Sequence, residues 1–140
     1  MIDGHRVVAW VPFGRERSVS ILAEYLRREH ERGVVDELWL FMNTNLQGQE
    51  SDIAYAYRLA ATHPDWVRIL ERAPDQPRRT PVQRNTTYGY RSMTDRDTVY
   101  VRLDDDIVYL QETKRGLARA PSGPRGPACL WAPMRTRARA

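Results

Sequence analysis

The 140-residue sequence predicts one α/β domain built on about four mainly parallel strands with flanking helices. Two observations lead to this prediction. Short apolar runs alternate with segments whose apolar residues recur at helical spacing, the pattern of strand–helix–strand units. Hydrophobic residues make up 41% of the chain, enough to form a core at this length.

The first strand and helix follow from the amino-terminal quarter. Val7–Val11 is a compact apolar run that ends at Pro12, which predicts a strand. Ser18–Arg32 predicts a helix that stops at Gly33. The apolar face expected for this helix consists of Ile21, Leu22, Tyr25 and Leu26.

The second strand and helix repeat this arrangement. Glu37–Met42 is rich in apolar residues and runs into the polar segment Asn43-Thr44-Asn45, so we expect a strand and its terminal loop. Ser51 is placed to cap the next helix, and Pro64 lies just beyond its end. Its expected apolar positions are Ile53, Tyr57 and Ala60.

Two further strands complete the predicted sheet. Val67–Leu70 predicts a short third strand. A proline-rich connection leads to a helix from about residue 82 to residue 93, although Gly89 weakens that helical pattern. Thr98–Leu103 alternates apolar and polar residues and predicts the fourth strand. Because the carboxyl ends of parallel strands meet at one edge, the polar loops should converge there.

Three consecutive aspartates, Asp104, Asp105 and Asp106, follow the fourth predicted strand. Carboxylates this close raise one another's pKa unless a cation or hydrogen-bonding ligand lies among them. If the strand continued, Asp104 and Asp106 would share a face, roughly 6 to 7 Å apart, and Asp105 would point the other way. Oxygen ligands favour Mg²⁺ or Mn²⁺, so the pattern predicts a metal and phosphate site. The structural alternative is a solvated acidic turn.

Amino-acid composition limits the binding partners and the cellular compartment that we expect for this protein. A single cysteine, Cys129, excludes an internal disulfide, and the three histidines are too scattered to predict a zinc site. No run is long enough to cross a membrane and no signal sequence precedes the first strand, so we expect a cytoplasmic protein. Seven of the 22 basic residues lie from Thr113 onward, which leaves 15 basic against 18 acidic residues before it. The folded part is therefore not basic, and no specific nucleic-acid partner is predicted.

The order of these motifs resembles the amino-terminal, nucleotide-binding half of a GT-A fold glycosyltransferase, of the broad kind that includes family 2. The likeness covers about Val7–Leu110. It consists of a first strand ending in Val-Pro-Phe-Gly, a polar loop after the second strand, the segment Gln83–Gly89, and the Asp-x-Asp at the end of the fourth strand. This resemblance implies a Rossmann-like fold and transfer of a sugar from a nucleoside-diphosphate donor to an acceptor that the sequence does not identify.

The resemblance also implies roles for individual residues. Asp106 would coordinate Mn²⁺ or Mg²⁺ on the diphosphate, and Asp104 would reach the ribose or the sugar directly or through water. Arg84, beside Asn85, would face the nucleotide with donors that suit a base edge or phosphate. The other positions that the likeness assigns to nucleotide binding are Pro12, Phe13, Arg15, Asn43 and Asn45. Asparagines stand where the family often has an aspartate that recognises the base, so the base stays open.

The chain changes character after Glu112. We expect residues 1–112 to form the domain and residues 113–140 to be a basic tail, with at most a frayed helix over Gln111–Ala118 and disorder over Arg119–Ala140. In the family, the acceptor half and its catalytic group would lie here. Our hypothesis is that the reading frame shifts after Leu110 and that the acceptor half is lost. The alternative is a basic arm for nucleic acid or an anionic membrane, with Trp131 as an aromatic contact.

Other functions remain open at this point. Asp104–Val108 also fits the Asp-x-Asp motif of haloacid-dehalogenase-like phosphatases, but there the motif ends the first strand and a long domain follows. Nucleotidyltransferases usually have a glycine-rich loop after the first strand, where this chain has one glycine. A non-catalytic nucleotide-binding remnant is the remaining alternative. Three aromatic residues are expected to belong to the core: Trp10, Trp39 and Tyr57.

Overall fold

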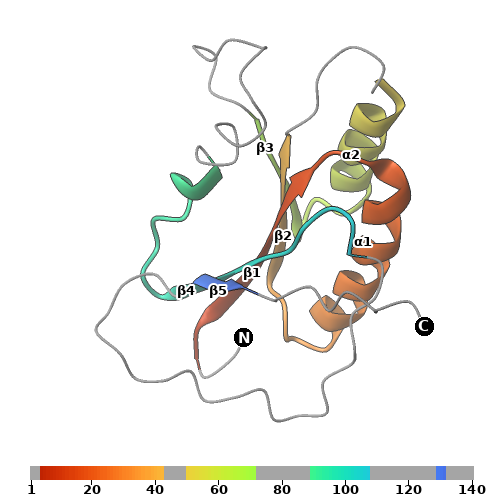
Figure 1. Cartoon of the computed structure of the whole chain (residues 1–140). Helices are drawn as coiled ribbons and strands as arrows, with labels where there is room; N and C mark the ends of the chain where they lie inside the picture. The colour runs from red at the N-terminus through yellow and green to blue at the C-terminus, as the bar shows by residue number, and fades with distance from the viewer. Residues whose placement is uncertain (1–3, 43–49, 72–88, 108–128, 132–140) are drawn as a thin grey trace, which may run out of the picture.

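The computed structural model describes residues 4–42, 50–71, 89–107 and 129–131. It confirms an α/β fold with a parallel sheet in the order β3-β2-β1-β4-β5 (Figure 1). Four strands form the body of the sheet, and a three-residue strand extends its edge. The elements are β1 (Arg6–Phe13), α1 (Glu16–Glu31), β2 (Glu37–Met42), α2 (Glu50–Thr62), β3 (Val67–Leu70), β4 (Thr98–Arg102) and β5 (Cys129–Trp131).

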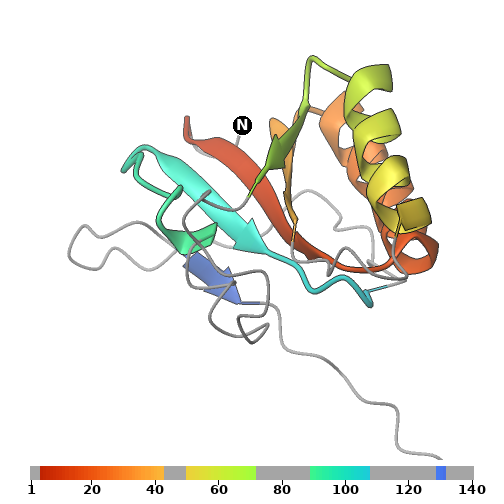
Figure 2. The ribbon, with the colours of Figure 1, turned by 90° about the horizontal axis from the view of Figure 1, so that it is seen from above.

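Both long helices cover the same face of the sheet, which Figure 2 shows from above. Side chains alternate between the two faces along each strand, so every second one points to the helices and packs against them. One core cluster fills the space between sheet and helices; among its members are Val7, Ala9, Val11, Phe13, Leu22, Leu26, Leu38, Leu40 and Val67. On the opposite face Val8, Trp10, Phe41 and Tyr100 are buried as well. The sheet is therefore apolar on both sides, as parallel sheets usually are.

The first strand is longer than the sequence predicts. It runs through Pro12 to Phe13, and Pro12 pairs in register with Phe41 of β2. On its other side, the last pair that β1 makes with β4 joins Trp10 to Arg102. Pro12 therefore lies beyond the end of β4, where a missing N–H removes no ladder hydrogen bond between these two strands.

Helix α1 begins at Glu16, two residues before the predicted start, and ends as predicted before Gly33. Gly33 has a φ of +71°, and the N–H of Val34 donates to the carbonyl of Glu29 at 2.9 Å. This closes the last turn of the helix in the way that glycine allows. The prediction that Ile21 faces the core is wrong, because its side chain is 44% exposed. Val19, Leu22, Ala23 and Leu26 are the buried positions instead.

Helix α2 also differs from its predicted pattern. It begins at Glu50, so Ser51 lies inside the first turn and is not the residue before the helix. The prediction that Tyr57 is a core aromatic is wrong: its side chain is 46% exposed, and its hydroxyl donates to Glu71 at 2.5 Å. Ala56 is the buried residue of this helix instead. Trp10 is confirmed as a core aromatic, and Trp39 is half-buried.

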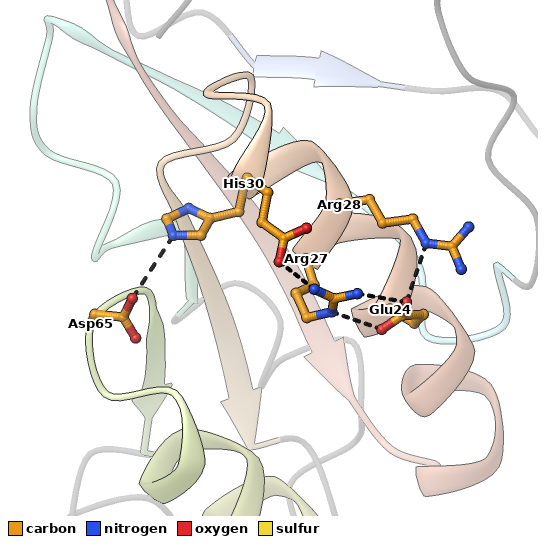
Figure 3. Close-up of polar contacts among 6 residues, drawn as sticks. Glu24, Arg27, Arg28, His30 and Asp65 are labelled. Atoms are coloured by element: carbon orange, nitrogen blue, oxygen red, sulfur yellow. Dashed lines mark hydrogen bonds and ion pairs between the residues drawn. The ribbon is translucent and has the colours of Figure 1, made fainter.

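The solvent face of α1 carries a set of ion pairs (Figure 3). Arg27 donates to both carboxylate oxygens of Glu24 at 2.9 Å, and Arg28 donates to the same carboxylate at 3.1 Å. The hydrogen bonds from Arg27 and then from Arg28 lower the pKa of Glu24 from 4.5 to about 2. Near the end of the helix, His30 stacks on Trp66 with 4.9 Å between ring centroids and faces Asp65 at 4.0 Å. The acids of this helix face are thus matched by cations of the same helix.

Only the end of the helix predicted over residues 82–93 can be compared, because residues 82–88 lie outside the described ranges. Residues 89 and 90 are helical. The N–H groups of Ser92 and Met93 then donate to the carbonyls of Gly89 and Tyr90, each at 3.1 Å, in a turn. The helix therefore ends about three residues earlier than predicted.

The predicted disorder of Arg119–Ala140 is wrong at three residues. Cys129–Trp131 forms β5, which pairs in parallel with Tyr100, Val101 and Arg102 of β4. Backbone pairing at a sheet edge leaves no sequence period in three residues, which is why the pattern did not reveal it. The rest of the tail lies outside the described residues, as does the frayed helix predicted over Gln111–Ala118. Within the described part of the chain, neither helix has the length and apolar character to cross a membrane.

Candidate functional site

The strand order creates a switch in direction at the centre of the sheet. From β1 the chain builds outward through β2 to β3, whereas β4 lies on the other side of β1. In open α/β sheets the two loops that leave such a pair of strands diverge and form a crevice at their carboxyl ends, and ligands bind there. In this chain those loops are Gly14–Arg15 and Leu103–Ile107. The switch point therefore coincides with the acidic residues singled out by their sequence.

The two loops are joined by an ion pair between Arg15 and Asp105. The Nη2 of Arg15 donates to Oδ1 of Asp105 at 3.0 Å, and the Nε donates to Oδ2 at 3.3 Å. These hydrogen bonds, the charge of Asp105 and the weaker field of Asp106 raise the pKa of Arg15. The Arg15 side chain remains 59% exposed, so the pair contributes little to stability but keeps a cation at the rim. Arg15 thus lies in the loop after β1, and its role in nucleotide binding stays a prediction.

Gly14 allows this contact. A Cβ atom built at Gly14 would lie 2.6 Å from Oδ2 of Asp105, closer than side-chain atoms approach one another. A larger residue there would push the Asp105 carboxylate away from the loop. The single glycine after β1 is therefore explained by the close approach of the aspartate.

The geometry of the aspartates differs from the prediction. Strand β4 ends at Arg102, and residues 105 and 106 form a turn in which the N–H of Ile107 donates to the carbonyl of Asp104 at 3.3 Å. The expectation that Asp104 and Asp106 share a strand face is therefore wrong, because no strand continues through them. Asp105, which was expected to point away, contacts the β1 loop. Asp106 is exposed, and Asp104 is half-buried.

Asp104 has a partner that the sequence reasoning missed. The Nη2 of Arg102 donates to Oδ1 of Asp104 at 3.0 Å, and the Nη1 donates to the hydroxyl of Tyr90 at 2.7 Å. Burial opposes the charge of Arg102, but the contacts with Tyr90 and Asp104 outweigh it and raise the pKa of this guanidinium. No sequence signal connects Tyr90 with β4, although the position of Arg102 two residues before Asp104 could have suggested their pairing.

The amino terminus of α1 also faces this edge, but it already has an anionic partner. The side chain of Arg15 makes no capping hydrogen bond, and Asp52 of α2 accepts from the N–H of Glu16 at 2.8 Å instead. A helix amino terminus attracts phosphate because of its unpaired N–H groups and its dipole. Here a carboxylate already occupies that position, so an anionic ligand at this edge would depend on other positive groups.

Six further predicted nucleotide-binding residues can be placed only in part. The side chains of Pro12 and Phe13 are buried, and the ring of Phe13 stacks on Tyr55 with 6.4 Å between centroids. A role for these two residues in a base pocket stays a prediction. The remaining four lie outside the described residues: Asn43, Asn45, Arg84 and Asn85.

The donor atoms at this edge decide which metal ion it could hold. Within residues 4–42, 50–71, 89–107 and 129–131, no three histidine, cysteine or acidic side chains gather as a ready-made metal cage. Mg²⁺ and Mn²⁺ at phosphate sites need fewer protein ligands, since one or two carboxylates share the ion with substrate oxygens and water. The exposed carboxylate of Asp106, with Asp104 two residues before it, fits that requirement.

Comparison with known proteins adds no assignment to these observations. No known protein family, curated protein or solved structure matches the chain.

Proposed function

We propose that the edge between β1 and β4 binds the diphosphate of a nucleotide sugar together with Mn²⁺ or Mg²⁺, as the donor site of a glycosyltransferase. The observation that carries the proposal is the contact of Arg15 with Asp105, which brings the β1 loop and the acidic turn together at the switch point of the sheet. The identity of the donor as a nucleotide sugar, and the transfer reaction, rest on the resemblance described above.

Each group at this edge has a distinct task in the proposal. Asp106 holds the cation, because it is the exposed acid of the turn. Asp104 accepts a hydrogen bond from a hydroxyl of the ribose or sugar. Arg15 binds a phosphate oxygen with donors that its exposed guanidinium presents to solvent. When bound, the cation supplies Lewis-acid stabilisation of the negative charge that forms on the departing diphosphate.

The capped amino terminus of α1 supports a requirement for the cation. In dinucleotide-binding folds a free helix terminus neutralises much of the phosphate charge. In this chain the carboxylate of Asp52 accepts from the N–H of Glu16 at that terminus, so the proposal assigns the diphosphate charge to Arg15 and a divalent ion, beside the Arg84 that the resemblance implies. A diphosphate held by one arginine alone would also meet repulsion from three neighbouring aspartates.

A second candidate is a nucleotide-binding module without metal or catalysis. It is favoured by one observation: Arg102 already pairs with Asp104, and Arg15 already pairs with Asp105. Two of the three negative charges are therefore balanced by the protein itself. In this alternative the arginines would exchange a carboxylate for phosphate when a nucleotide binds.

Thermal unfolding of the full chain distinguishes the two candidates. We expect UDP or GDP to raise the Tm only when Mn²⁺ or Mg²⁺ is present. At a ligand concentration about 100 times Kd the stabilisation is about 2.7 kcal/mol, which corresponds to roughly 5–10 °C in Tm. Uridine and guanosine, which lack the diphosphate, serve as matched controls and should have no effect.

The other outcomes have distinct meanings. An equal rise in Tm with EDTA in place of the metal would favour the metal-independent module. No rise with either diphosphate, with or without metal, would overturn the nucleotide site altogether.

A further inference from the structure

A tightly packed group of side chains lies on the sheet face opposite the two long helices. We call it the Trp10 stack; its members are Trp10, Gly89, Tyr90 and Arg102. Trp10 comes from β1 and Arg102 from the end of β4, where their backbones are paired in register. Gly89 and Tyr90 belong to the helical turn before β4. The stack therefore connects the segment that precedes β4 with the strand that delivers Asp104.

Trp10 is closely packed among its neighbours. Its side chain is fully buried, and its ring packs against Tyr90 and Phe41 with centroid distances of 5.1 and 6.0 Å. A Cβ atom built at Gly89 would lie only 2.2 Å from Cζ2 of the Trp10 ring. The helical turn thus approaches the ring as closely as a backbone without a side chain can. The two rings therefore form a closely packed surface on which another side chain can lie.

Arg102 lies on that surface. Its Cζ atom is 5.8 Å from the centroid of the Trp10 ring and 5.9 Å from that of Tyr90. One terminal nitrogen donates to the Tyr90 hydroxyl and the other donates to Asp104, so both ends of the guanidinium fork are fixed. A planar group held by two rings and two hydrogen bonds has one orientation, and it transmits that orientation to the Asp104 carboxylate.

The arrangement is costly as a purely structural feature. The Nε of Arg102 and the Nε1 of Trp10 are both buried, and neither has a hydrogen-bond acceptor among the described residues. Unpaired buried donors destabilise a fold, and apolar side chains of similar volume would fill the same space without that cost. Proteins typically leave buried polar groups unpaired at places where function requires a particular side chain.

We propose that Arg102 is a positioning residue for Asp104: it holds Oδ1 so that Oδ2 is presented to a ribose hydroxyl of the bound nucleotide. This inference rests on the proposed function and assigns ribose recognition to one carboxylate oxygen of that site. Arg102 touches no ligand in this arrangement. Arg102 acts through Asp104, and the other members of the Trp10 stack set the orientation of Arg102.

Discrimination between ribose and dideoxyribose tests the proposal in the full chain. The probes are the nucleoside diphosphate that binds the wild type, UDP or GDP, and its 2′,3′-dideoxy form, each with Mn²⁺. Because a hydrogen bond to a charged carboxylate is lost, we expect the wild type to bind the ribose form roughly 10- to 100-fold more tightly. Arg102→Lys should reduce this ratio to about 3-fold or less, since an ammonium cannot bridge Tyr90 and Asp104 in one plane.

Two further variants separate positioning from folding. Tyr90→Phe keeps the ring on Trp10 but removes the hydroxyl that fixes Arg102, so the ratio should fall to an intermediate value while the Tm changes little. Arg68→Lys is the matched control, because Arg68 is an exposed arginine of β3, far from Asp104 in the sheet order, that donates to the carbonyl of Pro64 at 3.1 Å and lies 3.8 Å from Glu37. It should keep the wild-type ratio.

Two results would overturn the inference while leaving the donor site intact: a wild type that binds both forms equally, or an Arg102→Lys protein that keeps the full ratio. If Arg102→Lys does not fold, an unchanged ratio in Tyr90→Phe would overturn it in the same way. Failure of the proposed function is a different observation, namely no metal-dependent binding of either diphosphate to the wild type, and it would remove this inference with it.

Discussion

Replacement of Trp10 by alanine should lower the free energy of unfolding by about 3–5 kcal/mol, as expected when a large buried aromatic side chain is removed. Trp10 is fully buried at the centre of the sheet and packs against Phe41 and Tyr90. The backbone of Gly89 already touches the Trp10 ring. Because glycine has no side chain, nothing at this position can move into the space that the ring leaves. Urea denaturation of the full-length variant measures the loss.

Trp39→Ala is the control for this prediction. Trp39 lies on the neighbouring strand but is only half-buried, and its Nε1 donates to Glu37 at 2.7 Å. Its removal should cost about 1–2 kcal/mol, because less apolar surface is lost. Equal losses for the two tryptophans would show that the Trp10 stack is not the rigid element that we describe. Trp10→Ala should also weaken the discrimination of ribose, since Arg102 loses the surface on which it lies.

Asp106→Asn should abolish the metal dependence of nucleotide binding, with a loss of at least about 10- to 100-fold in affinity when Mn²⁺ is present. The exposed carboxylate of Asp106 is the group assigned to the cation, and asparagine keeps its size but removes the charge. Isothermal titration of UDP or GDP into each variant, with Mn²⁺ and with EDTA, measures the effect.

Asp105→Asn provides the contrast within the same turn. Asp105 is engaged by Arg15 through two hydrogen bonds, so its change should free the arginine and leave the metal dependence in place. Glu31→Gln, an exposed acid of α1 paired with Arg27, should change nothing. If Asp105→Asn removed the metal dependence and Asp106→Asn did not, the assignment of the cation to Asp106 would be wrong.

The sequence was sufficient for the elements whose residues carry their own signal. The short run Val67–Leu70 located β3 at its observed bounds, the alternation of Thr98–Leu103 located β4 within one residue, and Gly33 marked the end of α1. Local patterns predict these features because the strands are marked by their own apolar residues and the helix end by the φ angle that glycine favours. The parallel arrangement followed from the alternation of strands and helices.

Features that depend on a distant partner were not predictable in this way. The start of α1 is set by Asp52, which lies 36 residues further along the chain. Asp105 faces Arg15 because the chain turns at residues 105 and 106, so the side-chain alternation of β4 does not extend to the aspartates. Ile21 and Tyr57 fit a helical apolar face, yet both are exposed, because the sheet covers a narrower stripe of each helix than the sequence pattern implies.

The location of bound Mn²⁺ tests the donor site between β1 and β4 most directly. Amide resonances of the full chain would be recorded with UDP or GDP and substoichiometric Mn²⁺, whose unpaired electrons broaden nearby signals. We expect selective broadening at Arg15, Asp105 and Asp106. Broadening centred on the solvent face of α1 around Glu24 and Glu31, or no localised broadening, would contradict a metal-dependent nucleotide site at this edge of the sheet.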